Sequence, residues 1–243
     1  MTDWETYASA PIPPYGPEDY RGVPVPAECG EELVDITHLH PRIAYDAAYL
    51  RQGLAGALNR CWVRRGVWER LRAAAERLPE GYSLLIFDSL RPLAVQRAIY
   101  DQFAARIRAR RPGITPAELE AELDGFVALP VKRPERPTPH STGGAVDLTL
   151  CYRGRPLDMG TGFDDLTEKA HTDWYERHPE GEEEPRRNRR RLYHLMDSVG
   201  LVSYSCEWWH YAWGERMWAM VRGEAPVYGF CPQCDFPDGA AAG

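Results

Sequence analysis

A buried strand followed at once by a helix is indicated by residues 82–92, which read YSLLIFDSLRP. The apolar run from Tyr82 to Phe87 lies between turn signals, and this pattern is typical of a short strand inside a protein. Pro92 then opens a helix, because proline is favoured in the first turn, where its missing N–H is not needed. Apolar residues recur at helical spacing after it, as far as Ile107.

Other helices and strands can be assigned outward from this pair. Helical spacing of apolar residues predicts a helix over 63–78, and a capping box predicts a shorter helix after Thr115. A third helix is expected over 185–198. The β-branched and aromatic content of 144–150 and 201–213 predicts strands. Because the elements alternate without a βαβ rhythm, we expect an α+β domain whose central, mostly antiparallel sheet is flanked by helices.

The chain has no evident linker or internal repeat, so one domain is expected. Residues 1–30 contain six prolines and predict an extended N-terminal arm or a segment that wraps over the surface. The globular domain is expected over residues 31–237, with a proline-rich loop at 127–139. Residues 238–243 are expected to form a flexible tail.

Composition excludes several classes of protein. The 243 residues include 29 Lys+Arg and 36 Asp+Glu, a formal charge of −7, which disfavours a protein that coats nucleic acid. No apolar run approaches the ~18 residues of a membrane span, and the N-terminus lacks a secretory pattern. Six cysteines are few for this length and suggest free thiols in a reducing compartment. We therefore expect a cytoplasmic location, and no nucleic-acid or membrane partner.

A first group of chemically active residues lies at the end of the proline-rich loop. The segment between His140 and Asp147 contains two glycines, and the Asp begins a predicted strand. His nitrogen and carboxylate oxygen are common zinc ligands. The glycines would let the chain turn so that both side chains converge. Alone, this pattern also fits a histidine that is merely hydrogen-bonded at the surface.

A second group is the sequence EWWH at residues 207–210. Two tryptophans between Glu207 and His210 put two polar groups in an apolar strand, where each needs a partner. A structural Glu–His pair is one interpretation. The other is a third zinc ligand, His210, beside a general base, Glu207, because catalytic zinc sites combine three protein ligands with a water that a carboxylate activates.

A third group is Arg91, at the turn between the strand and the helix of residues 82–92. A guanidinium at such a turn can reach into an active site and stabilise the oxyanion formed when water attacks a peptide carbonyl. The simpler interpretation is an ion pair with Asp88.

Together these three groups resemble the D-Ala-D-Ala dipeptidases, a family of zinc peptidases that includes the vancomycin-resistance dipeptidase. The family pattern S-x-H-x-x-G-x-A-I/V-D is similar to TPHSTGGAVD at residues 138–147, and the family's EWWHY is intact at 207–211. Arg91-Pro92 matches the family's Arg-Pro. Further similar segments are Leu148-Thr-Leu150, Met159-Gly160, Phe163-Asp164 and NRRRL at 188–192. The resemblance extends from about Glu31 to Pro237.

The resemblance implies one zinc ion per chain, held in a cleft by His140, Asp147 and His210. It implies Glu207 as the general base and Arg91 as the stabiliser of the transition state. It also implies three substrate-binding residues: Asp164 for the free amino group of the substrate, Thr138, and Tyr45.

The activity implied is zinc-dependent hydrolysis of the dipeptide D-Ala-D-Ala to two D-alanines. It would affect peptidoglycan precursor supply or turnover, with glycopeptide resistance as one use. The alternatives are a DD- or LD-carboxypeptidase acting on longer cell-wall peptides, and a non-catalytic zinc protein that binds wall peptides. Pro139 departs from the family pattern because it offers no backbone N–H to a substrate. The oligomeric state stays open.

Two remaining motifs favour structural interpretations. Cys231 and Cys234 form a single CxxC pair, which predicts a local redox pair or a reduced turn more readily than a zinc knuckle. Residues 182–191 form a block of charge in which glutamates precede Pro185 and arginines follow it. This order is typical of a helix N-terminus with a solvated face.

Overall fold

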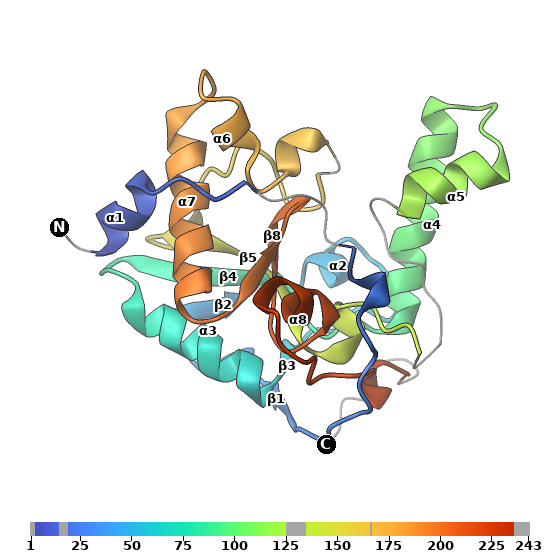
Figure 1. Ribbon diagram of the computed structural model, residues 1–243, viewed down its shortest axis with the longest axis horizontal. Helices are drawn as coiled ribbons and strands as arrows, with labels where there is room; N and C mark the ends of the chain where they lie inside the picture. The colour runs from blue at the N-terminus through green and yellow to red at the C-terminus, as the bar shows by residue number, and fades with distance from the viewer. Residues whose placement is uncertain (1–2, 15–18, 125–134, 166, 236–243) are drawn as a thin grey trace.

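The computed structural model describes residues 3–14, 19–124, 135–165 and 167–235. Its main sheet has six strands, in the order β2-β4-β5-β8-β7, with β6 paired to β5 (Figure 1). Only β2 and β4 are parallel; the other pairs are antiparallel. These strands are β2 (Ile43–Tyr45), β4 (Tyr82–Asp88), β5 (Ala145–Tyr152), β6 (Arg155–Pro156), β7 (Val202–Tyr204) and β8 (Glu207–Ala212). The sequence predicted an α+β domain, and the mixture of helices with a mostly antiparallel sheet is confirmed.

A separate two-stranded sheet and a set of helices complete the fold. The small sheet pairs β1 (Leu33–Asp35) with β3 (Trp62–Arg64). The α-helices are α1 (Asp3–Ser9), α2 (Ala48–Arg51), α3 (Arg65–Arg77), α4 (Leu93–Arg110), α5 (Pro116–Asp124), α6 (Trp174–Arg177), α7 (Glu183–Ser198) and α8 (Arg216–Arg222). The described part of the chain also has 3-10 turns, namely η1 (Tyr20–Gly22), η2 (His140–Thr142), η3 (Glu168–Ala170) and η4 (Pro232–Asp235). Among the described residues, no helix has the length and apolar character needed to cross a membrane.

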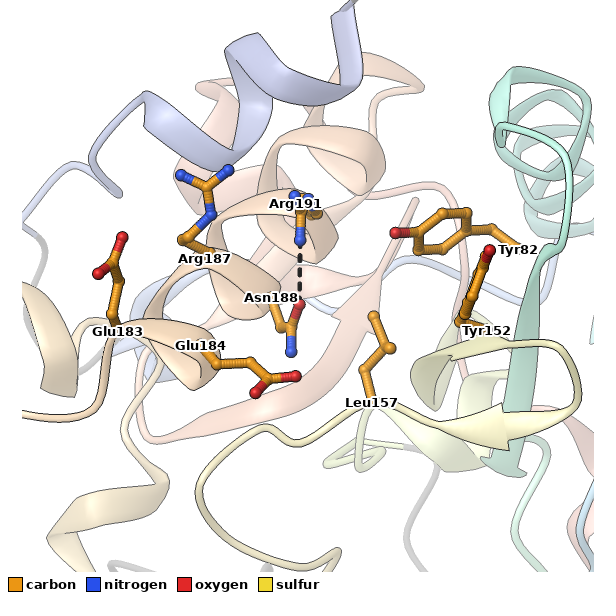
Figure 2. Close-up of a pocket in the computed structure, with 8 residues that line it drawn as sticks. All are labelled: Tyr82, Tyr152, Leu157, Glu183, Glu184, Arg187, Asn188 and Arg191. Atoms are coloured by element: carbon orange, nitrogen blue, oxygen red, sulfur yellow. Dashed lines mark hydrogen bonds between the residues drawn. The ribbon is translucent and has the colours of Figure 1, made fainter.

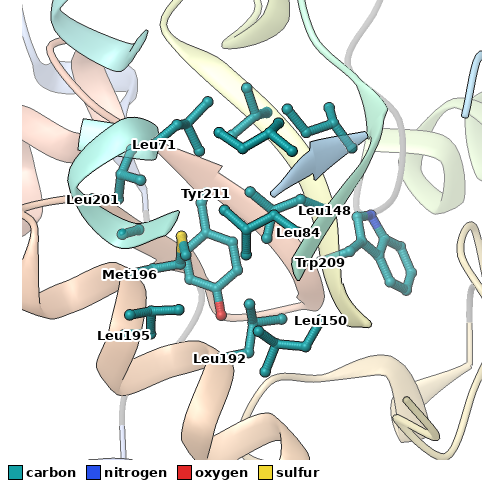
Figure 3. Close-up of a cluster of buried hydrophobic side chains, with 14 of the residues drawn as sticks. Leu71, Leu84, Leu148, Leu150, Leu192, Leu195, Met196, Leu201, Trp209 and Tyr211 are labelled. Atoms are coloured by element: carbon teal, nitrogen blue, oxygen red, sulfur yellow. The ribbon is translucent and has the colours of Figure 1, made fainter. Parts of the chain in front are cut away.

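The main hydrophobic core lies between the sheet and helices α3 and α7 (Figure 3). Alternate residues of β5 face it, including Val146, Leu148 and Leu150, because successive side chains of a strand point to opposite faces. Leu71 of α3 and Leu192 of α7 are fully buried against them. One face of the sheet is therefore filled by apolar packing, and Asp147 on β5 must point the other way.

A second cluster of buried apolar residues joins α2, α4 and α5. Pro92 is the residue before α4, and a capping box starts α5, where Thr115 and Glu118 exchange hydrogen bonds. In the cluster, Tyr49 of α2 packs with Val95 and Ile99 of α4. This packing fixes Tyr49 beside the end of β4.

Two local predictions are wrong. Residues 201–213 form not one strand but the hairpin of β7 and β8, because a turn at Ser205 and Cys206 reverses the chain. The expected extended arm contains helix α1, which has no proline and buries Trp4 and Ala8 on one side. Its Glu5 pairs with two arginines of α7. The loop predicted at 127–139 lies largely outside the described residues, as does the predicted tail.

A surface pocket of about 450 Å³ lies between α7 and the ends of β4 and β5 (Figure 2). It is lined by Tyr82, Tyr152, Leu157, Glu183, Glu184, Arg187, Asn188 and Arg191. None of the predicted catalytic, metal or substrate-binding residues is among them.

Replacing Trp4 by alanine should lower the free energy of unfolding by about 3 kcal/mol, the usual cost of emptying a large aromatic site. Trp4 is 6% exposed and packs edge-on against Tyr82, with ring centroids 4.8 Å apart. Urea unfolding of the two proteins measures the difference. Leu39→Ala, at a side chain that is 51% exposed, is the control and should change stability by less than about 0.5 kcal/mol. An equal effect of both substitutions would mean that α1 does not dock in solution.

Candidate active site

Strand pairing brings the first two predicted ligands together. Asp147 lies directly opposite His210 in the antiparallel pair of β5 and β8. Residues directly opposite on one face have Cβ atoms about 5 Å apart, so their side chains can meet. The His210 Nδ1 and Asp147 Oδ1 atoms are 3.0 Å apart. Both side chains are buried on the sheet face opposite the main core.

A β-bulge adds a second carboxylate to this face. The pairing of β4 with β5 shifts by one residue between Ile86 and Asp88, so that Asp88 lies opposite Asp147. Bulges commonly redirect a side chain next to an active site. Without the shift, Asp88 would point into the hydrophobic core with Ile86.

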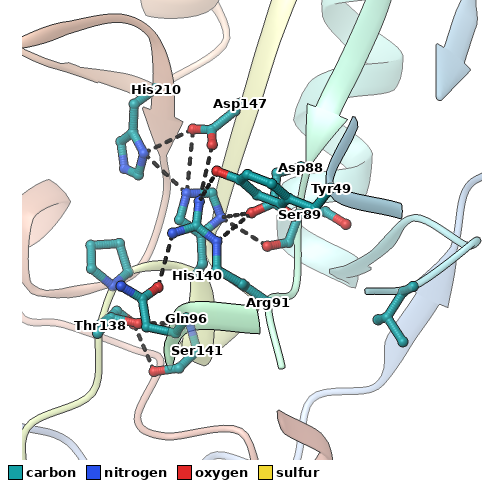
Figure 4. Close-up of polar contacts among 12 residues, drawn as sticks. Tyr49, Asp88, Ser89, Arg91, Gln96, Thr138, His140, Ser141, Asp147 and His210 are labelled. Atoms are coloured by element: carbon teal, nitrogen blue, oxygen red, sulfur yellow. Dashed lines mark hydrogen bonds and ion pairs between the residues drawn. The ribbon is translucent and has the colours of Figure 1, made fainter. Parts of the chain in front are cut away.

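His140 enters from a tight turn that depends on the two glycines after it. Gly143 has φ of +73°, a backbone conformation that other residues rarely adopt. A Cβ on Gly144 would lie 2.8 Å from the Trp213 carbonyl oxygen, so only glycine fits there. His140 Nδ1 is 2.8 Å from the carbonyl oxygen of Ser89 and must donate to it. The lone pair of His140 Nε2 therefore points toward Asp147 and His210, as a metal ligand requires (Figure 4).

The three donor atoms form a triangle that fits a metal ion. His140 Nε2 lies 3.2 Å from His210 Nδ1 and 3.3 Å from Asp147 Oδ1, and the third edge is 3.0 Å. Ligands at zinc distances of about 2.0–2.1 Å in tetrahedral geometry are about 3.3 Å apart. Two imidazoles and one carboxylate, together with a water, also match the composition of a catalytic zinc site. The residues present therefore fit the ion that the resemblance implies.

Asp147 is held in its ionised form. Burial alone would raise its pKa, but His140 and His210 lower the pKa of this carboxyl well below its usual range. Its second oxygen, Oδ2, accepts a hydrogen bond from Arg91 Nη2 at 3.3 Å. Oδ1 thus stays directed at the two histidines.

The guanidinium of Arg91 is fixed by partners on three sides. Its Nε donates to Asp88 Oδ2 at 2.7 Å, and Nη1 donates to Gln96 at 2.9 Å. Nη2 donates to the Tyr49 hydroxyl as well as to Asp147. Arg91 thus forms the ion pair with Asp88, and it also lies beside Asp147, one of the predicted metal ligands. Despite burial, the surrounding phenol and carboxylates raise the pKa of Arg91 above its usual value.

Glu207 begins β8 next to these groups. One of its carboxylate oxygens lies 3.9 Å from His210 Nδ1. Burial raises the pKa of Glu207 to about 7, against the lowering effect of His210. A carboxyl with a pKa near neutrality can both accept and return a proton, which is the property that a general base needs.

Asp164 reaches the site from the loop between β6 and α6. Its Oδ1 accepts a hydrogen bond from the Tyr49 hydroxyl at 3.3 Å. Burial raises the pKa of Asp164 to about 8, although Arg91 lowers it. Its φ of +60° is a strained value for a residue other than glycine, and such strain is often retained at functional sites.

The other two predicted substrate-binding residues have structural partners. The Thr138 hydroxyl accepts a hydrogen bond from the Ser141 amide, which starts the turn that carries His140. The Tyr45 hydroxyl donates to the carbonyl oxygen of Leu58. The tyrosine that contacts both Arg91 and Asp164 is Tyr49, which the sequence analysis missed.

Asp88 and Gln96 were also missed as members of the site. A signal for Asp88 was present, because it stands three residues before Arg91 in the segment already singled out. Gln96 carried a weaker signal, as a polar residue in the first turns of a helix that is otherwise apolar on its buried side.

The remaining motifs lie outside this cluster. All six cysteines are free thiols, and Cys231 and Cys234 are buried beneath the turn that carries His140. Cys234 Sγ donates to the carbonyl oxygen of Ser141. The charge block at 182–191 does mark the start of α7, and its glutamates are exposed, but Arg189 departs from the predicted solvated face because it is 2% exposed.

Comparison with known proteins identifies the class. Residues 30–222 match the model of a peptidase family described as D-ala-D-ala dipeptidase. A D-alanyl-D-alanine dipeptidase of Synechocystis is 32% identical over 82% of this chain and 88% of its own. One of Enterococcus faecium is 34% identical over 65% of this chain and 75% of its own. The protein is thus a peptidase. More narrowly, the chain belongs to the D-Ala-D-Ala dipeptidase family.

Among solved structures, the vancomycin resistance D,D-pentapeptidase VanY, crystallised with Zn(II), is similar to 83% of this chain and 90% of its own. The two share 18% sequence identity with a TM-score of 0.43.

The raised pKa of Asp164 predicts a stability cost that asparagine should remove. As pH rises from 3.8 toward about 8, the unfolded state ionises this carboxyl while the folded state keeps the proton, so folding stability falls. With chelator present, Asp164→Asn should therefore be more stable than the parent at pH 9, on the order of 1 kcal/mol, and the gain should shrink toward pH 5. Thermal unfolding at both pH values measures it.

Asp35→Asn is the matched control. Burial would raise the pKa of Asp35, but hydrogen bonds from Thr37 and Arg60 lower it below its usual value. Removing this charge should decrease stability at pH 9. A loss of stability in both variants would contradict the prediction for Asp164.

Proposed function

We propose that the protein is a zinc-dependent dipeptidase that hydrolyses D-Ala-D-Ala to two molecules of D-alanine. The observation that carries this proposal is the triangle of His140, Asp147 and His210 donor atoms with the Glu207 carboxylate beside it. Membership of the family and the names of the curated relatives support the choice of substrate.

His140, Asp147 and His210 would hold one zinc ion per chain. Bound there, the ion supplies Lewis-acid polarisation of the scissile carbonyl and a water of lowered pKa. Glu207 takes a proton from the attacking water and delivers a proton to the leaving amine. Both transfers suit a carboxyl whose pKa lies near 7.

Arg91 donates to the negative charge that develops on the carbonyl oxygen. Its guanidinium is already oriented by Asp88, Gln96 and Tyr49, so little reorganisation is needed during the reaction. A fixed cation in a buried position is worth more to a transition state than the same charge in water.

Asp164 binds the free amino group of the dipeptide. An ammonium beside this carboxyl would favour its ionised form, offset the burial that raises its pKa, and form a charge-assisted hydrogen bond. A longer wall peptide has no amine at that point, which argues against the carboxypeptidase alternative. The same proposal includes substrate-binding roles for Thr138 and Tyr45, a cleft around the zinc site, and a cytoplasmic location.

Removal of one ligand should abolish stoichiometric zinc binding. We expect the parent protein to retain about one zinc per chain after dialysis, as expected for three protein ligands, and His210→Ala to retain almost none. Metal analysis of the dialysed proteins by mass spectrometry measures this. His38→Ala, at an exposed histidine, is the control and should keep the zinc. Zinc retained by His210→Ala would overturn the ligand assignment.

Loss of the general base should remove activity but not metal. Glu207→Gln should lower kcat on D-Ala-D-Ala by about 10²- to 10⁴-fold, the usual contribution of a general base, with zinc content unchanged. Quantified release of D-alanine measures it, with Glu32→Gln at an exposed position as the control.

The substrate is decided with the zinc-loaded parent protein. D-Ala-D-Ala should be cleaved, whereas L-Ala-L-Ala and a wall pentapeptide should not. Release of alanine from the pentapeptide would favour the carboxypeptidase. Stoichiometric zinc without cleavage of any of the three would favour the wall-peptide-binding protein.

A further inference from the structure

A long loop between β6 and α6 carries Asp164 to the site. Of this loop, which we call the 158–171 loop, the structure describes residues 158–165 and 167–171. Phe163 stacks on Phe87 and meets Trp209 edge-on, with ring centroids 4.8 and 5.6 Å apart. These contacts seat the middle of the loop on the sheet, next to the strained backbone of Asp164.

Both ends of the 158–171 loop are bound by adjacent residues of α7. Arg189 Nε donates to the carbonyl oxygen of Met159 at 2.8 Å, at the start of the loop. Its Nη1 and Nη2 donate to the carbonyl oxygens of His171 and Lys169, at the end, at 2.6 and 2.7 Å. Asn188 Nδ2 adds a hydrogen bond to the carbonyl oxygen of Asp158 at 2.9 Å.

The environment of Arg189 is unusual for a buried cation. None of the ion pairs found among the described residues involves it, and its hydrogen-bond acceptors are backbone carbonyls of the loop. The guanidinium lies over the rings of Tyr175 and Trp208, 4.8 and 5.9 Å from their centroids. Burial lowers the pKa of Arg189 to about 10. Burying an unpaired cation is costly unless its hydrogen bonds are satisfied, and at Arg189 the carbonyl oxygens of the loop satisfy them.

We propose that Arg189 is a positioning residue that joins the two ends of the 158–171 loop and thereby sets the location of Asp164 relative to Arg91 and the ligand triangle. It consequently determines the selectivity for dipeptides with a free amino group. This selectivity rests on the proposed role of Asp164. Arginine suits this position because its planar fork places donors on three separate nitrogens, one for each carbonyl, whereas the three donors of a lysine radiate from a single nitrogen.

Two variants test the proposal. Arg189→Met removes every donor and keeps the apolar stem; Arg189→Lys keeps the charge and reaches fewer carbonyls. The control is Arg187→Met on the same helix, where the side chain is 34% exposed and pairs with Glu5. Thermal unfolding and zinc content show which variants fold and carry metal, and only those enter the comparison.

Hydrogen–deuterium exchange tests the positioning directly. The amides of the 158–171 loop should exchange at least tenfold faster in Arg189→Met than in the parent, with Arg189→Lys between them, while β5 is unchanged. Unchanged exchange in the loop would overturn the proposal whatever the activity.

Kinetics test the selectivity. With D-Ala-D-Ala, Arg189→Met should raise KM about tenfold and change kcat less than about threefold. The preference for D-Ala-D-Ala over its N-acetyl derivative should fall by a similar factor, and Arg187→Met should match the parent. A lower Tm with unchanged KM and preference would reduce Arg189 to a structural residue and overturn the proposal. If the parent cleaves no free-amine dipeptide, the proposed function fails and the selectivity claim fails with it. Hydrogen–deuterium exchange alone then tests whether Arg189 joins the two ends of the 158–171 loop.

Discussion

The arrangement of the site depends on two buried carboxylates that face each other across neighbouring strands. Asp88 and Asp147 are paired in register and are both nearly inaccessible to water. Like charges directly opposite on a sheet repel, and buried carboxylates need compensation. Arg91 supplies it by donating to both. Because its guanidinium reaches both carboxylates at once, the end of β4, the turn before α4 and the centre of β5 are tied together.

The positions of the histidines follow from this arrangement. His210 lies opposite Asp147 on β8, whereas Asp88 lies opposite it on β4, the strand on the other side of β5. His140 lies between the two carboxylates: its Nδ1 is 3.3 Å from Asp88 Oδ2, and its Nε2, which carries the lone pair, is 3.3 Å from Asp147 Oδ1. The guanidinium of Arg91 and the imidazoles of His140 and His210 therefore surround the two carboxylates. The same electrostatic balance that makes the buried cluster tolerable also leaves one carboxylate oxygen and two imidazole nitrogens converging on one point.

Much of the fold and of the candidate site could be predicted from the sequence, because these features depend on short stretches of neighbouring residues. The spacing of apolar residues predicted α3 and α4, and Pro185 with the closing Gly200 predicted α7. Short motifs brought His140, Asp147, Glu207, His210 and Arg91 into one hypothesis. The bulge that turns Asp88 toward Asp147 has no local signal, because it depends on the register of β4 against β5. Tyr45 and Tyr49 are four residues apart with similar neighbours, and only the packing of α2 against α4 decides which hydroxyl meets Arg91. Helix α1 was missed because prolines dominate the composition of the segment around it.

The run of arginines on α7 has a consequence for how the chain is held together. Successive residues of a helix point about 100° apart, so four consecutive side chains sweep around the whole axis. Asn188 and Arg189 face the loop that carries Asp164, Arg190 forms a double hydrogen bond with Glu176 of α6, and Arg191 reaches Glu5 of α1. One turn of α7 therefore binds three separate stretches of chain, namely the 158–171 loop, α6 and α1. A displacement of α1, such as one caused by a fusion at the N-terminus, would therefore act on the same turn of α7 that holds the loop carrying Asp164.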